Sequence, residues 1–273
     1  MKIYINEGSF GFDMSPLEKI DLISNSEFSG IGFWFEKLDL WFHQANADPQ
    51  EFKSLLQTKN VDVIEINFLR CLFTHDYENP KLQHEISRGI YYAKLFGAPF
   101  LTAATFGEDL QPSLYRENIS KLAEKLEQEG LSLAIEFLPW TEIPSITKLQ
   151  ELIAVVDRDN VGILLDTYHF FMGDPDLDAL KRIPPEKIFL IHGNDLLRDT
   201  DLFSKLSLIE ITRGYRVAPG LGDFPLNQFF KTLREMGVNA PVSLEVLNKD
   251  STSQYHIESV LNSYTSTLHQ IGA

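Results

Sequence analysis

Residues 161–170, which read VGILLDTYHF, decide the fold expected for this chain. The segment begins as an uninterrupted apolar run, which is typical of a parallel strand buried on both faces. It ends with a carboxylate, Asp166, and an imidazole three residues later, His169. A charged acid at the end of a buried strand costs free energy unless something compensates it. The segment therefore predicts a buried strand whose carboxyl end carries polar chemistry.

Three other apolar segments end in the same way. LSLAIEF contains Glu136, IFLIHGND contains His192 and Asp195, and VSLEV contains Glu245. A lone acid at a strand end is more often a helix cap or an ion-pair partner, and a lone histidine is more often structural. Four such residues at the same level of four successive strands favour a shared role instead. We therefore expect Glu136, Asp166, His192 and Glu245 to bind one divalent metal ion.

Strand and helix patterns alternate along the whole chain. Strand patterns cover residues 2–6, 30–35, 61–67, 99–106, 131–137, 161–168, 188–194 and 242–246. Helical patterns cover residues 16–25, 49–58, 85–96, 114–129, 146–156, 177–182 and 225–236, and a closing helix contains Ile257, Val260, Leu261, Tyr264 and Leu268. Eight such units with a period of about 30 residues predict an α/β fold, a (β/α)8 TIM barrel, as one domain over residues 1–273.

A doubly wound open sheet is the alternative to the barrel. That fold would need a G-x-G-x-x-G turn after the first strand, and GSFG at residues 8–11 does not supply it. The longest gap between elements, residues 196–224, leaves the rim where barrel active sites are built. Loops of this length in compact domains are usually functional or disordered. Because this one leaves that rim, we expect it to cover the substrate.

Composition limits the classes of partner. The chain has 39 acidic and 24 basic residues, a formal net charge of −15, which opposes binding to nucleic acid or anionic membranes. Cys71 is the only cysteine, which excludes an internal disulfide and indicates a cytoplasmic protein. No apolar run reaches the roughly 18 residues that span a bilayer, and MKIYINEGSF lacks the apolar core of a secretory signal.

The four expected ligands, three carboxylates and one imidazole, suit Mn²⁺, Mg²⁺ or Co²⁺, and Zn²⁺ also accepts such a set. His169 is expected to follow Asp166 on a loop and to contact substrate or a metal-bound water. Asp195 either supports His192 or caps a helix. Four more residues lie near strand ends and are expected either to line a pocket or to pack in the core: Glu7, Trp34, Asn67 and Trp140.

One metal between two glutamates suits proton transfer on an α-hydroxyketone. The metal would polarise the carbonyl and acidify the neighbouring C–H. Glu136 and Glu245 would face the substrate from opposite sides, one removing a proton to give a metal-bound enediolate and the other returning it. Arg198 and His169 would stabilise the oxyanion. The expected product is an isomer or an epimer of a keto-sugar.

These motifs resemble the xylose-isomerase-like barrels of the sugar phosphate isomerase/epimerase superfamily, and within it the inosose (2-keto-myo-inositol) isomerases of inositol catabolism. The resemblance rests on MKIYINEG, NVGILLDTYHF, KIFLIHGND, RVAPGLGDF and VSLEV. The pairs Asp166–His169 and His192–Arg198 also match the D-x-x-H and H-x5-R patterns of ketohexose 3-epimerases. The resemblance implies that Glu136, Asp166, His192 and Glu245 bind the metal, and that the two glutamates are the acid/base pair.

The chain also departs from its relatives. Residues 32–34 read GFW where inosose isomerases tend to have I-E-I, and residues 137–140 read FLPW rather than F-V-G-H, so a more aromatic pocket is expected. Dehydroshikimate dehydratases of this fold have His and Lys where Leu138 and Asn194 stand here. Alternatives are an abasic-site endonuclease with three zinc ions and a non-catalytic sugar-binding barrel. The expected partner is a small-molecule substrate, a keto-sugar or an inosose. The sequence does not decide whether the chain forms a homo-oligomer.

Overall fold

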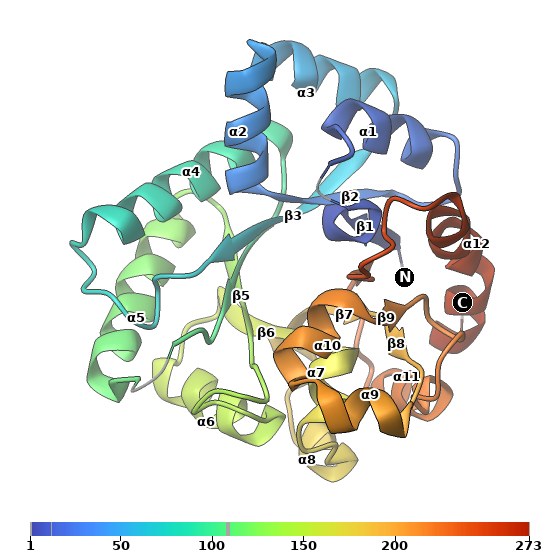
Figure 1. Ribbon diagram of the computed structural model, residues 1–273. Helices are drawn as coiled ribbons and strands as arrows, with labels where there is room; N and C mark the ends of the chain where they lie inside the picture. The colour runs from blue at the N-terminus through green and yellow to red at the C-terminus, as the bar shows by residue number, and fades with distance from the viewer. Residues whose placement is uncertain (1, 12, 108–109, 273) are drawn as a thin grey trace.

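Eight parallel strands close into a barrel in the computed structural model, which describes residues 2–11, 13–107 and 110–272 (Figure 1). Around the barrel the strands follow the order β1-β10-β7-β6-β5-β4-β3-β2. Their bounds are β1 Ile3–Asn6, β2 Gly30–Trp34, β3 Asp62–Leu69, β4 Phe100–Ala104, β5 Ser132–Glu136, β6 Val161–Asp166, β7 Ile188–Gly193 and β10 Val242–Leu244. The predicted (β/α)8 barrel is confirmed, and each predicted strand has its counterpart.

Helices surround the barrel in Figure 1. The main ones are α1 Pro16–Ser24, α2 Phe35–Ala45, α3 Pro49–Thr58, α4 Pro80–Phe96, α5 Pro112–Gln128, α6 Ile146–Val156, α8 Leu177–Lys181, α11 Leu226–Glu235 and α12 Gln254–Ile271. The sequence predicted α3 and α6 with these same ends. It missed α2, because its N-cap, Trp34, makes no side-chain capping bond and so gives no start signal.

Residues 196–224 are more ordered than the sequence suggested. They include α9 Thr200–Lys205, α10 Leu208–Gly214 and β9 Arg216–Val217, and β9 pairs antiparallel with β8 Asp195–Leu196. Asp195 fixes this excursion, because its carboxylate accepts backbone N–H groups of Leu196, Gly220 and Phe224 at 2.8, 3.1 and 3.0 Å. Gly222 is required beside it, since a Cβ there would lie 2.4 Å from Asp195 Oδ1. Asp195 is thus a loop anchor, which corrects both roles predicted for it.

The inside of the barrel changes from apolar to polar along the strands. Five buried side chains form an apolar cluster: Tyr4, Ile64, Ala134, Leu164 and Leu190. Side chains two positions apart on a strand face the same side. Asn6, Glu136, Asp166 and His192, each two residues after a member of this cluster, therefore form a polar layer above an apolar floor.

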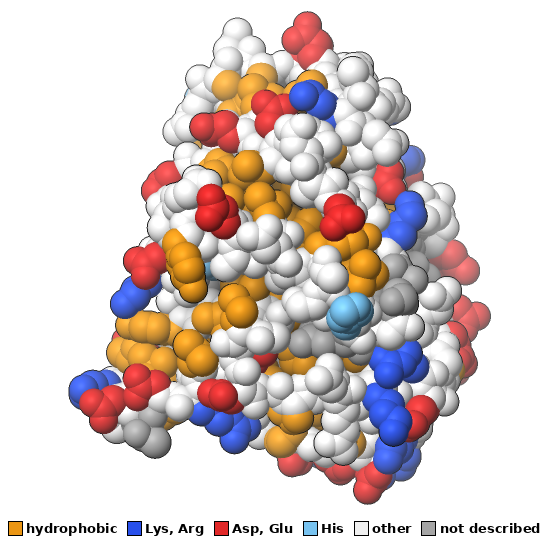
Figure 2. Space-filling view, turned by 90° about the vertical axis from the view of Figure 1, so that its right-hand side faces the viewer, with side chains coloured by type: hydrophobic (Ala, Val, Ile, Leu, Met, Phe, Trp, Pro, Cys, Tyr) orange, Lys and Arg blue, Asp and Glu red, His pale blue; other side chains and the backbone are white. Residues whose placement is uncertain are grey.

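The outer surface reflects the acidic composition. On the face shown in Figure 2, acidic side chains are spread from top to bottom among apolar and uncharged ones. In the part of the chain that the structure describes, none of the helices combines the length and the apolar character needed to traverse a bilayer. Three short helices complete the fold: η1 Glu7–Phe10, α7 Thr167–Met172 and η2 Pro185–Lys187.

Candidate metal centre

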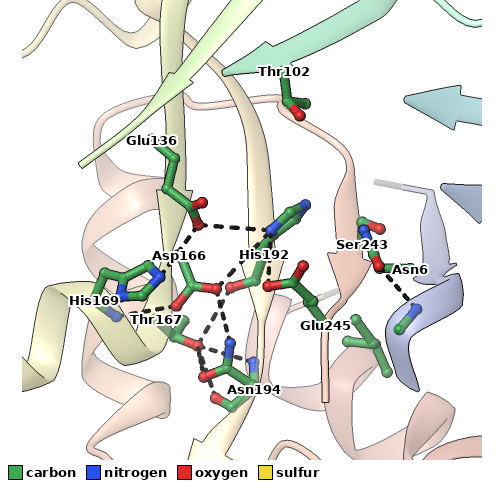
Figure 3. A network of polar contacts seen from close by, with 12 residues as sticks. Asn6, Thr102, Glu136, Asp166, Thr167, His169, His192, Asn194, Ser243 and Glu245 are labelled. Carbon is green, nitrogen blue, oxygen red and sulfur yellow. Dashed lines mark hydrogen bonds and ion pairs between the residues drawn. The ribbon is translucent and has the colours of Figure 1, made fainter. Parts of the chain in front are cut away.

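Four side chains meet at the carboxyl ends of neighbouring strands, as the sequence predicted. Glu136, Asp166, His192 and Glu245 are all buried, and each offers one ligand atom within 4.8 Å of the others. From His192 Nδ1, the nearest oxygens of Glu245, Glu136 and Asp166 lie at 3.5, 3.8 and 4.0 Å. Figure 3 shows the four side chains pointing toward one another.

The chemistry of this cluster fits a divalent cation. Glu136 Oε1 and His192 Nδ1 are buried and have no hydrogen-bond partner within the described residues. Buried polar atoms are rarely left in this state, because each lost hydrogen bond costs free energy. Three carboxylates and an imidazole nitrogen are also a donor set that Mn²⁺, Mg²⁺, Co²⁺ and Zn²⁺ accept. The four residues predicted as ligands could therefore hold such an ion.

Glu65 on β3 contacts the imidazole of His192 on the side away from the cluster, and it was not among the residues predicted from the sequence. His192 Nε2 lies 2.9 and 3.1 Å from the two Glu65 oxygens. Asn6 Nδ2 and Ser243 Oγ donate to Glu65 Oε1 at 3.2 and 2.8 Å. Gly32 leaves the space for this carboxylate, since a Cβ there would lie 2.3 Å from Glu65 Oε1. With Nε2 bound to Glu65, Nδ1 of His192 is the nitrogen directed at the cluster.

We expect the substitution Glu65→Gln to weaken binding of Mn²⁺ by about 10- to 100-fold, because loss of such a partner frees the ligand imidazole to rotate. Isothermal titration of the metal-free protein with Mn²⁺ measures this. Glu85→Gln is the matched control: Glu85 is also buried, but it accepts the backbone N–H groups of Arg70 and Cys71. Equal affinities in the two variants would refute the role of Glu65.

The guanidinium that bonds to the cluster belongs to Arg216 on β9 and not to the predicted Arg198. Arg216 Nη1 donates to Asp166 Oδ2 and to Glu245 Oε2, both at 2.9 Å, and its side chain is 2% exposed. Arg198 is exposed, its backbone N–H donates to Asp223, and its side chain does not line the cavity at the cluster. The reason is the turn at Asp195, which takes residue 198 outward and returns the chain at residue 216.

His169 lies in the short helix α7 rather than on a loop. Asp166 caps this helix, accepting the backbone N–H of His169 at 3.0 Å. The imidazole packs edge-on against Trp140, and its Nε2 lies 3.6 Å from Glu136 Oε1. Burial lowers the pKa of His169 to about 4. His169 is therefore neutral near pH 7, and its ring lies next to Glu136.

The three carboxyl groups of the cluster differ in their pKa values. Burial and the charges of Asp166 and Glu245 raise the pKa of Glu136 well above its ordinary value. Burial opposes ionisation of Asp166 too, but Arg216 and the two histidines outweigh it and lower that pKa. For Glu245, burial is outweighed by His192 and Arg216, and its pKa is also lowered. Glu136 is thus the carboxyl group of the cluster whose negative charge is least compensated by neighbouring positive charges.

Glu245 is held from the side of α12. Ser9 Oγ donates to the carbonyl of Leu244 and accepts the N–H of Val246, at 2.7 and 2.8 Å. His256 Nε2 lies 2.8 Å from the Ser9 carbonyl, to which it donates. These bonds fix the backbone on both sides of Glu245.

His256 should make stability depend on pH. Burial lowers its pKa below the ordinary value of 6.5, so folding favours the neutral ring. The contribution of His256 to the free energy of unfolding is therefore present above pH 6.5 and is lost as the pH falls toward the pKa of His256 in the folded protein. We expect His256→Gln, which can still donate to Ser9, to flatten the fall in melting temperature between pH 7.5 and 5. Parallel curves for the two proteins would contradict this.

A cavity of about 300 Å³ opens above the cluster. Glu136, Glu245, His169 and Arg216 line it, whereas Asp166 and His192 do not. Its wall is otherwise largely aromatic and aliphatic: Trp34, Phe68, Phe106, Leu138, Trp140 and Leu247. The expectation of a more aromatic pocket is met at Trp34 and Trp140. Of the other two residues considered for the wall, Glu7 forms a buried ion pair with Lys19 at 2.9 Å, and Asn67 lies inside the barrel near Thr102.

Residues 20–263 match the model of the xylose isomerase-like TIM barrel family. The chain belongs to this family. Curated relatives include a 3-dehydroshikimate dehydratase of Pseudomonas aeruginosa, 30% identical over 139 residues that cover 50% of this chain and 21% of that protein. The inosose isomerase of Bacillus licheniformis is 29% identical over 152 residues, 52% and 49% of the two chains. The inosose isomerase of Halalkalibacterium halodurans is 27% identical over 209 residues, which cover 73% of this chain and 72% of that protein.

The match thus spans less than half the length of the first two of these relatives. Two solved structures with low sequence identity share the fold. The IolI protein, crystallised with a zinc atom, has a TM-score of 0.86 at 20% identity, covering 100% of this chain and 98% of that one. A D-psicose 3-epimerase from Clostridium cellulolyticum has a TM-score of 0.77 at 12% identity, covering 99% of both chains. The resemblance predicted from the sequence is confirmed at the level of the family.

Proposed function

We propose that this protein is a divalent-metal-dependent isomerase or epimerase of a ketose or ketoinositol. The observation that carries the proposal is the placement of two glutamates on one cavity. Glu136 ends β5 and Glu245 follows β10, and the two strands between them in the barrel carry Asp166 and His192. Two carboxyl groups therefore face a substrate from separate sides, with the other two ligands behind them.

Glu136, Asp166, His192 and Glu245 would hold the cation. When bound, such an ion polarises a ketone oxygen and makes the neighbouring C–H more acidic. Arg216 stabilises the carboxylate form of Glu245, so we assign Glu245 as the base that removes a proton from carbon. Glu136 would then return a proton at a second carbon or on the other face.

Arg216 and His169 have supporting roles in this proposal. The Arg216 guanidinium lies at the cavity and would offset negative charge that develops on a substrate oxygen. The neutral imidazole of His169 can donate a hydrogen bond to a substrate hydroxyl. The aromatic wall restricts water and can pack against the C–H face of a sugar ring.

A dehydratase is the second candidate, because the Pseudomonas relative carries that name. Loss of water also begins with removal of a proton next to a ketone. Two residues differ from the His and Lys expected in dehydroshikimate dehydratases. Leu138 lines the cavity, and Asn194 Nδ2 donates to Asp166 Oδ2 at 3.0 Å. Neither side chain can act as a general acid, so we favour isomerisation.

The test is a screen of keto-sugars and inososes in D₂O with Mn²⁺, followed by NMR. We expect deuterium at the carbon next to the ketone and a rearranged product with the same number of oxygens. A product that has lost water and absorbs in the ultraviolet would identify a dehydratase instead. No exchange with any of the compounds would refute the proposed function.

A further inference from the structure

The cavity is lined by two guanidinium groups that the proposed reaction does not use. Arg70 and Arg213 line it together with Arg216. Arg70 follows β3 and Arg213 lies on α10, so the two reach the cavity from different parts of the rim. Arg216 is occupied by Asp166 and Glu245. Within the described part of the chain, no ion pair joins Arg213 to an acidic side chain, and Arg213 is exposed.

Aromatic rings hold Arg70 in place. Its guanidinium carbon lies 4.4, 5.4 and 5.7 Å from the ring centres of Phe68, Phe106 and Trp34. These three rings also line the cavity. Stacking of this kind fixes the plane of a guanidinium without using its N–H donors. The Arg70 side chain is therefore positioned, and most of its five donors remain available to a ligand.

The ion pair of Arg70 with Glu36 is weak. Arg70 Nε lies 3.5 Å from Glu36 Oε2, and the two side chains are 36% and 48% exposed. Exposed ion pairs of this kind contribute little to stability, with a median of about 0–1 kcal/mol. A better placed anion inside the cavity could compete with Glu36 for Arg70.

Arginines are concentrated on the cavity wall, although the chain as a whole is acidic. The whole chain has a formal net charge of −15. Three arginines and two glutamates line the cavity. Arg216 is paired with Asp166 and Glu245, so Arg70 and Arg213 are the guanidinium groups of the wall that remain for a ligand. A divalent cation at the four ligands would make the cavity more positive. Such a wall attracts an anion and raises its local concentration.

We infer that the substrate carries an anionic group, a carboxylate or a phosphate, which Arg70 and Arg213 bind at the rim of the cavity. The inference rests on the proposed function, because it assumes that the ketone lies over the four ligands. The apolar face of the substrate then packs against the aromatic wall, and its anionic end lies near the two arginines. This arrangement selects acidic keto-sugar derivatives over neutral ones.

Binding without turnover tests the inference. The Mn²⁺-loaded full chain is titrated calorimetrically with quinate, a polyhydroxylated cyclohexane carboxylate, and with its neutral methyl ester. A second pair is myo-inositol 1-phosphate and myo-inositol. We expect at least one anion to bind about tenfold or more tightly than its neutral partner, as for a charge-assisted hydrogen bond. The pair with the larger ratio identifies carboxylate or phosphate as the bound group.

Variants decide which residues cause the preference. Arg70→Met and Arg213→Met keep the apolar stems and remove the charges, and together they should reduce the ratio to about twofold or less. Arg116→Met is the matched control, because Arg116 is exposed and does not line the cavity. Melting temperature and Mn²⁺ affinity verify that each variant is folded and loaded.

Two results would overturn the inference: equal binding of anion and neutral partner, or a preference that survives in the double variant. The second result would mean that the anion binds the metal directly. Failure of the proposed function is a separate outcome. In that case the anion preference persists and depends on Arg70 and Arg213, while no compound exchanges deuterium.

Discussion

Glu136→Gln is expected to lower the rate at which a solvent-derived proton is delivered to the product carbon by about 10²- to 10⁴-fold, the range that a positioned general acid or base contributes. The amide keeps an oxygen for the cation but cannot carry the proton. Glu136 is also the carboxyl group of the cluster that makes no bond to Arg216, which bonds to Asp166 and Glu245 instead. Its proton should therefore be the one available for transfer. Deuterium incorporation measured by NMR gives the rate.

Glu142→Gln is the matched control for this change. Glu142 lies six residues further along, is exposed and does not line the cavity, so exchange should match that of the unmodified protein. The Mn²⁺ content of Glu136→Gln separates loss of the proton carrier from loss of the ion. A variant that is fully loaded and still delivers the proton to the product carbon at the original rate would remove Glu136 from the mechanism.

Parts of this molecule that depend on local patterns could be predicted from the sequence. The apolar runs are strands because they are buried on both faces, and their polar ends converge because parallel strands in a closed barrel end at one rim. Asp166 and His192 illustrate this: they are partners in the β6–β7 register, although 26 residues separate them. Strand ends alone were enough to predict that these two side chains would meet.

Two residues of the site have no such local signal. Glu65 lies inside a strand, and only the space beside Gly32 and the distant Ser243 and His192 make a buried carboxylate tolerable there. Arg216 lies 24 residues after His192, beyond two short helices. Its place depends on how Asp195 folds residues 196–224 back over the barrel. The H-x5-R spacing favoured Arg198 because sequence distance cannot show where such a loop returns.

Arg216→Met is expected to destabilise the metal-free protein by about 3–5 kcal/mol, the usual cost of removing one partner from a buried ion pair. Arg216, Asp166 and Glu245 are all at most 5% exposed, so water cannot replace the lost guanidinium. Asp166 and Glu245 would become protonated or the fold would open. Urea unfolding of protein treated with chelator measures the loss. Arg182→Met is the control, because Arg182 pairs with Asp176 at 3.9 Å on the surface. Loss of such an exposed pair lowers the free energy of unfolding by only about 0–1 kcal/mol.

A cation should rescue this variant if the four predicted ligands bind one. In the unmodified chain, Arg216 already neutralises part of the carboxylate charge, so Mn²⁺ adds less. In Arg216→Met the ion would be the main positive charge among three carboxylates, and a ligand that binds only the folded state stabilises it by mass action. We therefore expect Mn²⁺ to raise the melting temperature of Arg216→Met by more than that of the unmodified protein. An equal increase in both would show that the ion and the guanidinium do not compensate the same carboxylates.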